Sequence, residues 1–346
     1  MKYDRQIKLL FCILFLVLLI VPNAILFSDD RNKLPAFNID NPIGSVIRFK
    51  NSYKNNFFFK PEMVDSYLKF KLDILDDVPL KNTVITGKDG WYFLGNEYNQ
   101  LLNDGFGSYP FSEFELIKIK NSLKRIIDTL TSKGVAFYIV VPPNKHRVYP
   151  EKLPYHIKQK PTRLEVLNSY LKKEIDFEIL DLRDTLVANK GKELLYYKTN
   201  THWNDLGAFI AYHKTLNTLQ LDLPKEDISN YTFDYKPIQR GDITEMINLK
   251  LEENAIFLNK KISSELIPLK TEHHHLHFKN PNRNKKLIMH RDSFSNAWIQ
   301  FFNESFGETI YFRNYSIRPE VIDKEKPDVV IFEIIERELS TVLLNL

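Results

Sequence analysis

The chain has 346 residues, of which 43% are apolar and 13% aromatic, and this composition excludes a globally disordered protein. The formal net charge is only +4 and no Lys/Arg-rich block occurs, so the basic surface typical of a nucleic-acid-binding protein is excluded. A single cysteine, Cys12, excludes an intrachain disulfide and a thiolate metal cluster.

The first predicted element is an uncharged apolar segment at residues 9–27. As a helix it would rise about 28 Å, close to the ~30 Å hydrocarbon core of a bilayer. Three basic residues precede the segment: Lys2, Arg5 and Lys8. The positive-inside rule then predicts a cytoplasmic tail at residues 1–8 and places everything after residue 28 in the periplasm or at the cell surface.

A cleaved signal peptide is the alternative, because the unbroken apolar part at residues 9–21 has the length of an h-region. The following "VPNAILF" offers no small-x-small cleavage site and resumes apolar character, which favours an uncleaved transmembrane signal anchor. Residues 28–80 are predicted to form a connector. Within it, a modestly amphipathic stretch at 61–75 is typical of a helix that packs on the main domain.

From residue 81 onward, short apolar runs alternate with amphipathic stretches, which is typical of an α/β domain whose mainly parallel sheet is covered on both faces. The predicted strands are 135–141, 177–180, 286–289, 309–312 and 329–334. The predicted helices are 112–132, 162–173, 205–219, 294–306 and 319–324. Residues 225–285 are predicted to be an irregular lid or insertion in a domain spanning 81–346. Sites in such sheets lie at the carboxyl ends of the strands.

Three loops bring reactive side chains to that edge. Asn144 and Lys145 follow the first strand, Ser293 lies at the apex of a sharp strand-to-helix turn, and His202 precedes a helix. Each also has a simpler interpretation, namely a rigid turn, a helix cap at Asp292 or Ser293, or a structural histidine. Together the three loops supply a nucleophile, a base and an oxyanion donor, which predicts a serine acyl-transfer site.

Five segments carry a family resemblance in their order along the chain: "ITGKDGWYFLGNE" (85–97), "VVPPNKHRVYPEKLP" (140–154), "THWNDLGAFIAY" (201–212), "HRDSFS" (290–295) and "KPDVVIFEIIERELS" (326–340). The series resembles that of the AlgX/AlgJ-type alginate O-acetylation proteins. The resemblance implies an SGNH-hydrolase-like three-layer α/β/α sandwich with a mainly parallel sheet. It also implies a polysaccharide acceptor outside the cytoplasmic membrane, a multi-pass membrane acyltransferase as acetyl donor, and no cofactor.

The resemblance places the nucleophile on Ser293 and the base on His202. The family's Asp-x-His-Trp arrangement would put the acid on Asn200, and Arg291 replaces a glycine two residues before the serine. An asparagine can orient the imidazole but cannot stabilise imidazolium by charge. Three carboxylates are alternative acids: Asp205, Asp242 and Asp292. We expect Asn200→Asp to raise activity modestly, unless one of these three already holds His202.

Two further side chains have both a binding and a structural interpretation. Trp203 could stack on a sugar ring, although packing in the core is the better fit for a tryptophan beside a helix. Arg337 follows the last predicted strand and suits either substrate binding or a structural ion pair with Glu333 or Glu336.

The segment "HHHLH" (273–277) would place His273, His275 and His277 on one face of a strand. Imidazoles are good zinc ligands, but no carboxylate or cysteine lies at a recognisable ligand spacing. We therefore predict a polar surface strand and no metal site.

Three functions fit these features. The first is an O-acetyltransferase that acts on a glycan through a serine acyl-enzyme. The second is a carbohydrate esterase that uses the same groups with water as the acceptor. The third is a non-catalytic glycan-binding or assembly protein in which Asn200 marks a decayed triad.

Overall fold

The computed structural model describes residues 2–28, 35–56, 82–155, 160–239, 241–262 and 264–346. Its contacts divide the chain into two units, Met1–Asp77 and Val78–Leu346. The first unit contains helices α1 (Lys2–Ser28) and α2 (Pro42–Asn56). Among the described residues, no helix combines the length and the apolar character needed to cross a membrane. The amphipathic stretch predicted at 61–75 lies outside the described residues.

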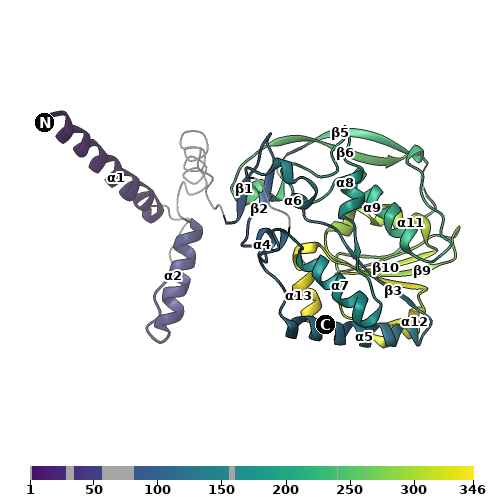
Figure 1. The fold of residues 1–346 in the computed structure, drawn as a ribbon. Helices are drawn as coiled ribbons and strands as arrows, with labels where there is room; N and C mark the ends of the chain where they lie inside the picture. The colour runs from purple at the N-terminus through teal and green to yellow at the C-terminus, as the bar shows by residue number, and fades with distance from the viewer. Residues whose placement is uncertain (1, 29–34, 57–81, 156–159, 240, 263) are drawn as a thin grey trace. The chain divides into compact units, whose positions relative to one another are not determined.

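A seven-stranded mixed sheet forms the centre of the second unit (Figure 1). The strand order is β4-β3-β11-β9-β10-β8-β7. The five parallel strands are β3 (Ala136–Val141), β4 (Leu180–Asp181), β9 (Lys286–His290), β10 (Glu308–Phe312) and β11 (Val329–Glu333). Strands β7 (Ile267–Glu272) and β8 (His275–Lys279) continue the sheet in antiparallel pairing. Each parallel strand overlaps a predicted one, although β4 is limited to two residues.

Helices cover both faces of this sheet, which makes the unit a three-layer α/β/α sandwich (Figure 1). One face packs against α5 (Glu113–Thr131), α7 (Arg163–Ile175), α12 (Pro319–Glu325) and α13 (Leu339–Leu344). The other packs against α8 (Arg183–Ala188), α9 (Asp205–Thr218) and α11 (Ile299–Ser305). The apolar run of β9 is continuous because the strand is buried on both faces. Ile288 packs in the core under α5 and α7, whereas Leu287 and Met289 pack in the core under α9 and α11.

In the range 225–285, which the sequence predicts to be an irregular lid or insertion, the described residues include strands β5 to β8. Strands β5 (Tyr231–Gln239) and β6 (Glu252–Lys260) form a long hairpin whose connecting segment contains α10 (Asp242–Met246). Strand β5 alternates aromatic and polar residues at 231–236, yet it is exposed along most of its length. The remaining short elements are β1 (Val84–Thr86), β2 (Tyr92–Leu94), α4 (Leu101–Gly105), α6 (Lys145–Val148), η3 (Pro150–Lys152), η4 (Ile228–Asn230), η5 (Phe294–Ala297) and η6 (Glu336–Glu338).

Candidate active site

The loops that follow β3, β11 and β9 meet at one edge of the sheet, because β11 lies between the other two strands. Asn144 and Lys145 follow β3, Arg337 follows β11, and Ser293 follows β9 three residues after the strand ends. The loop before α9 brings His202 to the same place. The structure therefore collects the predicted reactive side chains at the carboxyl ends of the strands.

Ser293, His202 and Asn200 form a continuous hydrogen-bonded chain. The Ser293 hydroxyl lies 2.8 Å from Nε2 of His202, and Nδ1 of the same ring lies 2.7 Å from Oδ1 of Asn200. The backbone N–H of His202 also donates to that Asn200 atom at 3.0 Å, and an N–H can only donate, so the atom facing Nδ1 must be the amide oxygen. Nδ1 therefore carries the proton, and Nε2 is free to accept the proton of Ser293.

Among the three alternative acids, Asp242 is the one in contact with His202. Its Oδ2 lies 3.5 Å from Nδ1 of His202 and accepts a 2.5 Å hydrogen bond from the Thr201 hydroxyl, while its Oδ1 accepts from the Thr201 N–H at 2.6 Å. Burial raises the pKa of Asp242, but the interactions with His202 and the hydrogen bonds from Thr201 outweigh burial and hold the pKa below its ordinary value. Asp242 is therefore ionised at neutral pH.

The other two candidate acids accept hydrogen bonds from backbone N–H groups and not from the histidine. Asp205 accepts from the N–H of Leu258 on β6 at 3.0 Å. Asp292 accepts from the N–H groups of Phe294 and Ile335 at 2.8 and 2.7 Å, and so ties the nucleophile turn to the end of β11. Neither Asp205 nor Asp292 contacts His202 among the described residues.

A buried carboxyl group lies behind the nucleophile turn. Oε2 of Glu333 accepts from the N–H of Asp292 at 3.0 Å and from the hydroxyl of Ser295 at 2.5 Å. Complete burial and the neighbouring Asp292 carboxylate raise the pKa of Glu333 well above its ordinary value, which favours a neutral acid there. This network fixes the backbone on both sides of Ser293.

Arg291, which stands where the family has glycine, fits the turn without strain. It is not among the described non-glycine residues with positive φ. Its guanidinium donates to the carbonyl of Asp292 at 3.0 Å and to Oδ1 of Asn296 at 2.7 Å. The arginine thus braces the turn instead of crowding it.

Two N–H groups at this edge are available to an oxyanion. The N–H of Ser293 and the Nδ2 amide of Asn144 have no hydrogen-bond partner within the described ranges. By contrast, the N–H of Phe294 already donates to Asp292. The backbone of Asn144 is fixed by its own N–H, which donates to buried Glu336 at 2.8 Å. This arrangement agrees with the predicted oxyanion role of Asn144.

The ammonium of Lys145 binds backbone carbonyls, which differs from the oxyanion or substrate contact predicted from the sequence. It is buried, and its ammonium donates to the carbonyls of Tyr197, Lys198 and Asn200 at 3.1, 2.9 and 2.8 Å. Burial lowers the pKa of Lys145 to about 7, against the opposing effect of Asp242 and Glu253. Three carbonyl acceptors need three N–H donors, so the ammonium form is the one that this loop requires. Lys145 is a positioning residue for the segment that carries Asn200 and His202.

Replacing Lys145 by methionine should therefore destabilise the fold by about 3 kcal/mol, because three buried carbonyls lose their donor. Acyl-transfer activity should fall with it, since Asn200 and His202 lose their support. The measurements are chemical unfolding and the initial rate, with Lys124→Met as the matched control. Lys124 is exposed and pairs with Asp128 one turn away on α5, so its loss should cost less than about 0.5 kcal/mol. Equal stability of the two variants would contradict the role assigned to Lys145.

For Trp203 and Arg337, the contacts in the structure favour one of the two interpretations predicted from the sequence. Trp203 is buried, and its indole N–H donates to the carbonyl of Phe294 at 3.0 Å, so it packs under the nucleophile turn and cannot stack on a sugar. Arg337 makes no ion pair with Glu333 or Glu336 in the described structure. Its guanidinium lies over the ring of Phe294 at 5.6 Å and 3.5 Å from Oδ1 of Asn144, which leaves the substrate-binding interpretation.

Two site residues escaped the sequence analysis. Thr201 lies between His202 and Asp242, with its hydroxyl 3.1 Å from Nδ1 of His202. Glu253 on β6 accepts from the N–H groups of Lys198 and Thr199 and from the Thr199 hydroxyl. No local sequence pattern predicts that β6 contacts this loop, so Glu253 could not be identified as a site residue from the sequence. Thr201 could have been identified, because it lies between the candidate residues Asn200 and His202.

The histidine-rich segment does not have the predicted arrangement. His273 lies in the turn before β8, so the three alternate histidines do not share one strand face. His273 contacts Arg313 at 2.8 Å, His275 stacks on Phe312, and His277 contacts Glu308 at 2.6 Å. Strand β8 joins the main sheet through β10, which accounts for its place in the fold.

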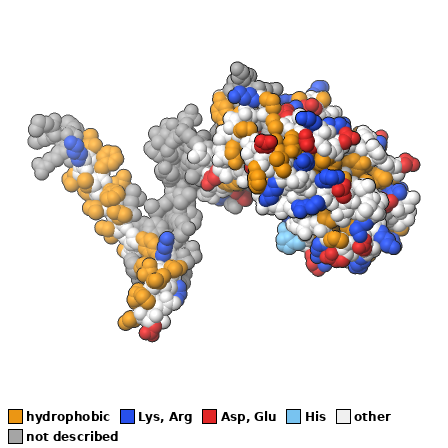
Figure 2. All heavy atoms as spheres, turned by 60° about the horizontal axis from the view of Figure 1, so that its bottom comes forward, with side chains coloured by type: hydrophobic (Ala, Val, Ile, Leu, Met, Phe, Trp, Pro, Cys, Tyr) orange, Lys and Arg blue, Asp and Glu red, His pale blue; other side chains and the backbone are white. Residues whose placement is uncertain are grey.

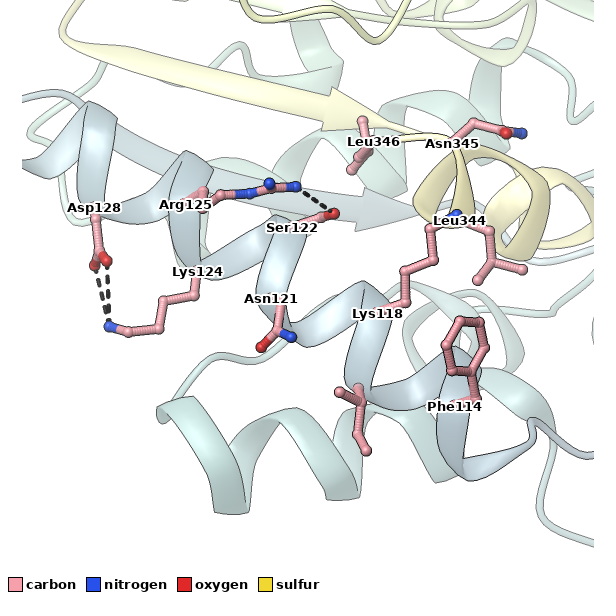
Figure 3. Close-up of a pocket in the computed structure, with 11 residues that line it drawn as sticks. Phe114, Lys118, Asn121, Ser122, Lys124, Arg125, Asp128, Leu344, Asn345 and Leu346 are labelled. Atoms are coloured by element: carbon pink, nitrogen blue, oxygen red, sulfur yellow. Dashed lines mark hydrogen bonds and ion pairs between the residues drawn. The ribbon is translucent and has the colours of Figure 1, made fainter.

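The surface adds two observations. Basic and acidic side chains are interspersed on the face shown in Figure 2. Figure 3 shows a pocket between α5 and the C-terminal end of the chain, where Phe114, Lys118 and Arg125 face Leu344 and Leu346. None of the candidate catalytic residues lines that pocket, so it has no part in the site at the sheet edge.

Comparison with known proteins supports this interpretation of the fold. Bacillus cereus PatB1 aligns over 75% of this chain and 98% of its own length, with a TM-score of 0.56 and 20% identity. The structure of PatB1 with a sulfonyl adduct has the same identity and a TM-score of 0.59, over 75% and 97% of the two chains. A DHHW family protein from Eubacterium siraeum gives a TM-score of 0.52 at 16% identity, over 76% and 98% of the two chains. No curated protein matches the sequence.

The sequence itself matches one family description, "SGNH hydrolase-like domain, acetyltransferase AlgX", over residues 84–268. The matched part includes Asn200, His202 and Asp242, and Ser293 is brought to them by the fold. Because the match covers more than half of the chain, this protein belongs to the family of AlgX-type acetyltransferases with an SGNH-hydrolase-like domain.

Proposed function

We propose that this chain is an O-acetyltransferase that moves acetyl groups onto hydroxyls of an exopolysaccharide or cell-surface glycan through an acyl-enzyme on Ser293. The observation that carries the proposal is the oriented chain from Ser293 through His202 to Asn200. If the chain had lost catalysis, selection would no longer maintain an arrangement in which Nδ1 of His202 is held by Asn200 and Nε2 faces the serine hydroxyl. The non-catalytic alternative is therefore the weaker one.

The first half-reaction would begin with attack of the Ser293 oxygen on the carbonyl carbon of an acetyl donor. Its proton moves to Nε2 of His202, and the negative charge on the carbonyl oxygen is met by the N–H of Ser293 and the amide of Asn144. The tetrahedral intermediate collapses, the bond to the leaving group breaks, and His202 returns the proton to that leaving group. Ser293 now carries the acetyl group as an ester.

The second half-reaction repeats these steps with a glycan hydroxyl as nucleophile. His202 takes the proton of that hydroxyl, the glycan oxygen attacks the acetyl carbon, and the ester bond to Ser293 breaks. Nε2 then reprotonates the serine. Arg337 and Asn144 lie where an acceptor would approach, and a multi-pass membrane acyltransferase would be the source of the acetyl donor.

The proposal is tested by incubating the purified full-length chain with an activated acetyl ester and a defined oligosaccharide. We expect acetylated oligosaccharide by mass spectrometry, and none with Ser293→Ala. Release of acetate without acetylated oligosaccharide would identify an esterase. The distinction depends on whether the acyl-enzyme is protected from water until the acceptor binds.

We also propose that residues 9–27 anchor the chain in the cytoplasmic membrane, with the catalytic unit on the outer side. The uncharged segment and the basic residues before it support this topology. Deleting residues 2–28 should move the protein from the membrane fraction to the soluble fraction while leaving the catalytic unit active on a soluble acetyl ester. A soluble mature protein that begins near residue 25 would contradict the anchor.

A further inference from the structure

We propose that Asp242 supplies the negative charge that Asn200 lacks, so that the orienting role and the charge-stabilising role of a triad acid are divided between two residues. This inference rests on the proposed function, because it concerns the base of that reaction. It assigns a role to a carboxylate from the β5–β6 connection, remote in sequence from the motif that carries His202.

The contacts at Nδ1 of His202 separate the two roles. Asn200 makes the short contact, 2.7 Å, and fixes the tautomer, but its amide is neutral. Asp242 is 3.5 Å from the same nitrogen, which is too long for a good hydrogen bond but well within the range of a strong charge interaction. The Thr201 hydroxyl lies 3.1 Å from Nδ1 and donates to Asp242 at 2.5 Å, so Thr201 lies between the ring nitrogen and the carboxylate.

The position of Asp242 is built into the fold. Gly241 precedes it, and a side chain at that position would collide with the backbone carbonyl of Thr199, so only glycine lets α10 approach the His202 loop this closely. Ile243 of α10 and Ile247, which directly follows that helix, pack with Val84 and Leu94 of the β1–β2 hairpin. Both carboxylate oxygens of Asp242 accept hydrogen bonds from Thr201. The carboxylate is thus held in place before the reaction begins.

In the described part of the chain, Asp242 is the carboxylate recorded within 4 Å of the His202 ring. The other charged or titratable groups that act on Asp242 are Lys145 from α6 and Tyr98 from the segment before α4. Glu253 of β6 acts on Lys145, and Arg337 acts on Tyr98. Glu253 accepts hydrogen bonds from the N–H groups of residues 198 and 199, and Lys145 donates to three carbonyls. Neither is directed at the imidazole.

The step that Asp242 assists is formation of imidazolium. When the Ser293 oxygen bonds to the acetyl carbon, its proton passes to Nε2 and the ring becomes positive. The proton on Nδ1 stays on the ring, bonded to Asn200, and the Asp242 carboxylate stabilises the ring by charge without receiving a proton. Asp242 therefore acts through His202, as a positioning and charge-stabilising residue.

The test compares pH–rate profiles of the full-length chain and Asp242→Asn. We expect the plateau rate to fall by about 10²- to 10³-fold, which is less than the about 10⁴-fold of a triad that loses its carboxylate, because Asn200 still fixes the tautomer. Asp234→Asn is the matched control: Asp234 lies on β5 of the same hairpin and pairs with exposed Lys236, so its profile should not change.

A double variant separates charge from structure. In Asp242→Asn with Asn200→Asp, a carboxylate returns to Nδ1 of His202 from position 200, and we expect at least a tenfold recovery of rate. Recovery supports the inference, since a purely structural loss at Asp242 could not be repaired at position 200. An unchanged profile in Asp242→Asn, or a loss without recovery in the double variant, would overturn it.

Labelling distinguishes this failure from failure of the proposed function. A sulfonyl fluoride should modify Ser293 of the wild type, as seen by peptide mass spectrometry, and should modify Asp242→Asn at least tenfold more slowly. Equal labelling rates would remove Asp242 from the mechanism and leave Ser293 as nucleophile. If the wild type itself is not modified at Ser293, the acyl-enzyme proposal fails together with the inference.

Discussion

Ser293→Ala should abolish acyl transfer while leaving the fold intact. The serine oxygen is the atom that forms the bond to the acetyl group, and loss of a serine nucleophile of this kind lowers kcat by about 10⁶-fold. The serine is half-buried and its side-chain partner is His202, so removing one oxygen should change stability by less than about 1 kcal/mol. The measurements are the rate of oligosaccharide acetylation and the thermal unfolding midpoint.

Ser316→Ala is a suitable control for Ser293→Ala. Ser316 lies exposed in the segment between β10 and α12, and in the described structure it has no recorded contact with Ser293, His202 or Asn200. Its loss should change neither the rate nor the unfolding midpoint. Acetylation by Ser293→Ala at the wild-type rate would remove Ser293 from the reaction.

His202→Ala should lower acyl transfer about as much as Ser293→Ala, because without the imidazole no group in the described site can take the proton of the serine. The double variant should be no slower than either single variant, since the nucleophile and its base act as one unit and their losses do not add. Added imidazole should restore part of the rate to His202→Ala and none to Ser293→Ala.

The ring of His202 also packs on Phe294, with the ring centroids 4.7 Å apart. Removing the ring could therefore loosen the nucleophile turn as well as remove the base. An unfolding measurement on His202→Ala shows whether the nucleophile turn has loosened. Multiplicative losses in the double variant, or an effect of imidazole on Ser293→Ala, would show that the two residues do not work together.

The parts of this protein that sequence reasoning predicted are those in which local pattern and burial coincide. Strands β3, β9 and β11 are buried on both faces, so their apolar runs are continuous and easily recognised. The turn that carries Ser293 could be predicted because it directly follows such a strand. His202 was identified by its place before α9 and by the family resemblance.

The parts that could not be predicted depend on contacts between distant segments. Strand β5 alternates aromatic and polar residues, but this pattern does not show that its hairpin carries Asp242 and Glu253 to the His202 loop. Lys145 follows a strand, as a substrate-binding residue would, but its burial under carbonyls of residues 197–200 is a property of the fold alone. Local periodicity contains no information about either contact.

Asn200→Asp illustrates the difference. From the sequence alone, a modest gain in activity was expected because a missing charge would return. With Asp242 at 3.5 Å from the same ring nitrogen, the substitution instead adds a second negative charge. Because Asp242 already supplies the charge, activity near pH 7 should stay flat or fall.

The central claim is that Ser293 becomes acetylated in the course of the reaction, and trapping of that intermediate tests it most directly. The full-length chain is mixed with an activated acetyl ester in the absence of acceptor, quenched in acid within the first turnover, digested and analysed by mass spectrometry. We predict one acetyl group on the peptide that contains Ser293, lost on addition of a glycan acceptor with the appearance of acetylated glycan. A peptide that stays unmodified while acetylated glycan accumulates would contradict the account.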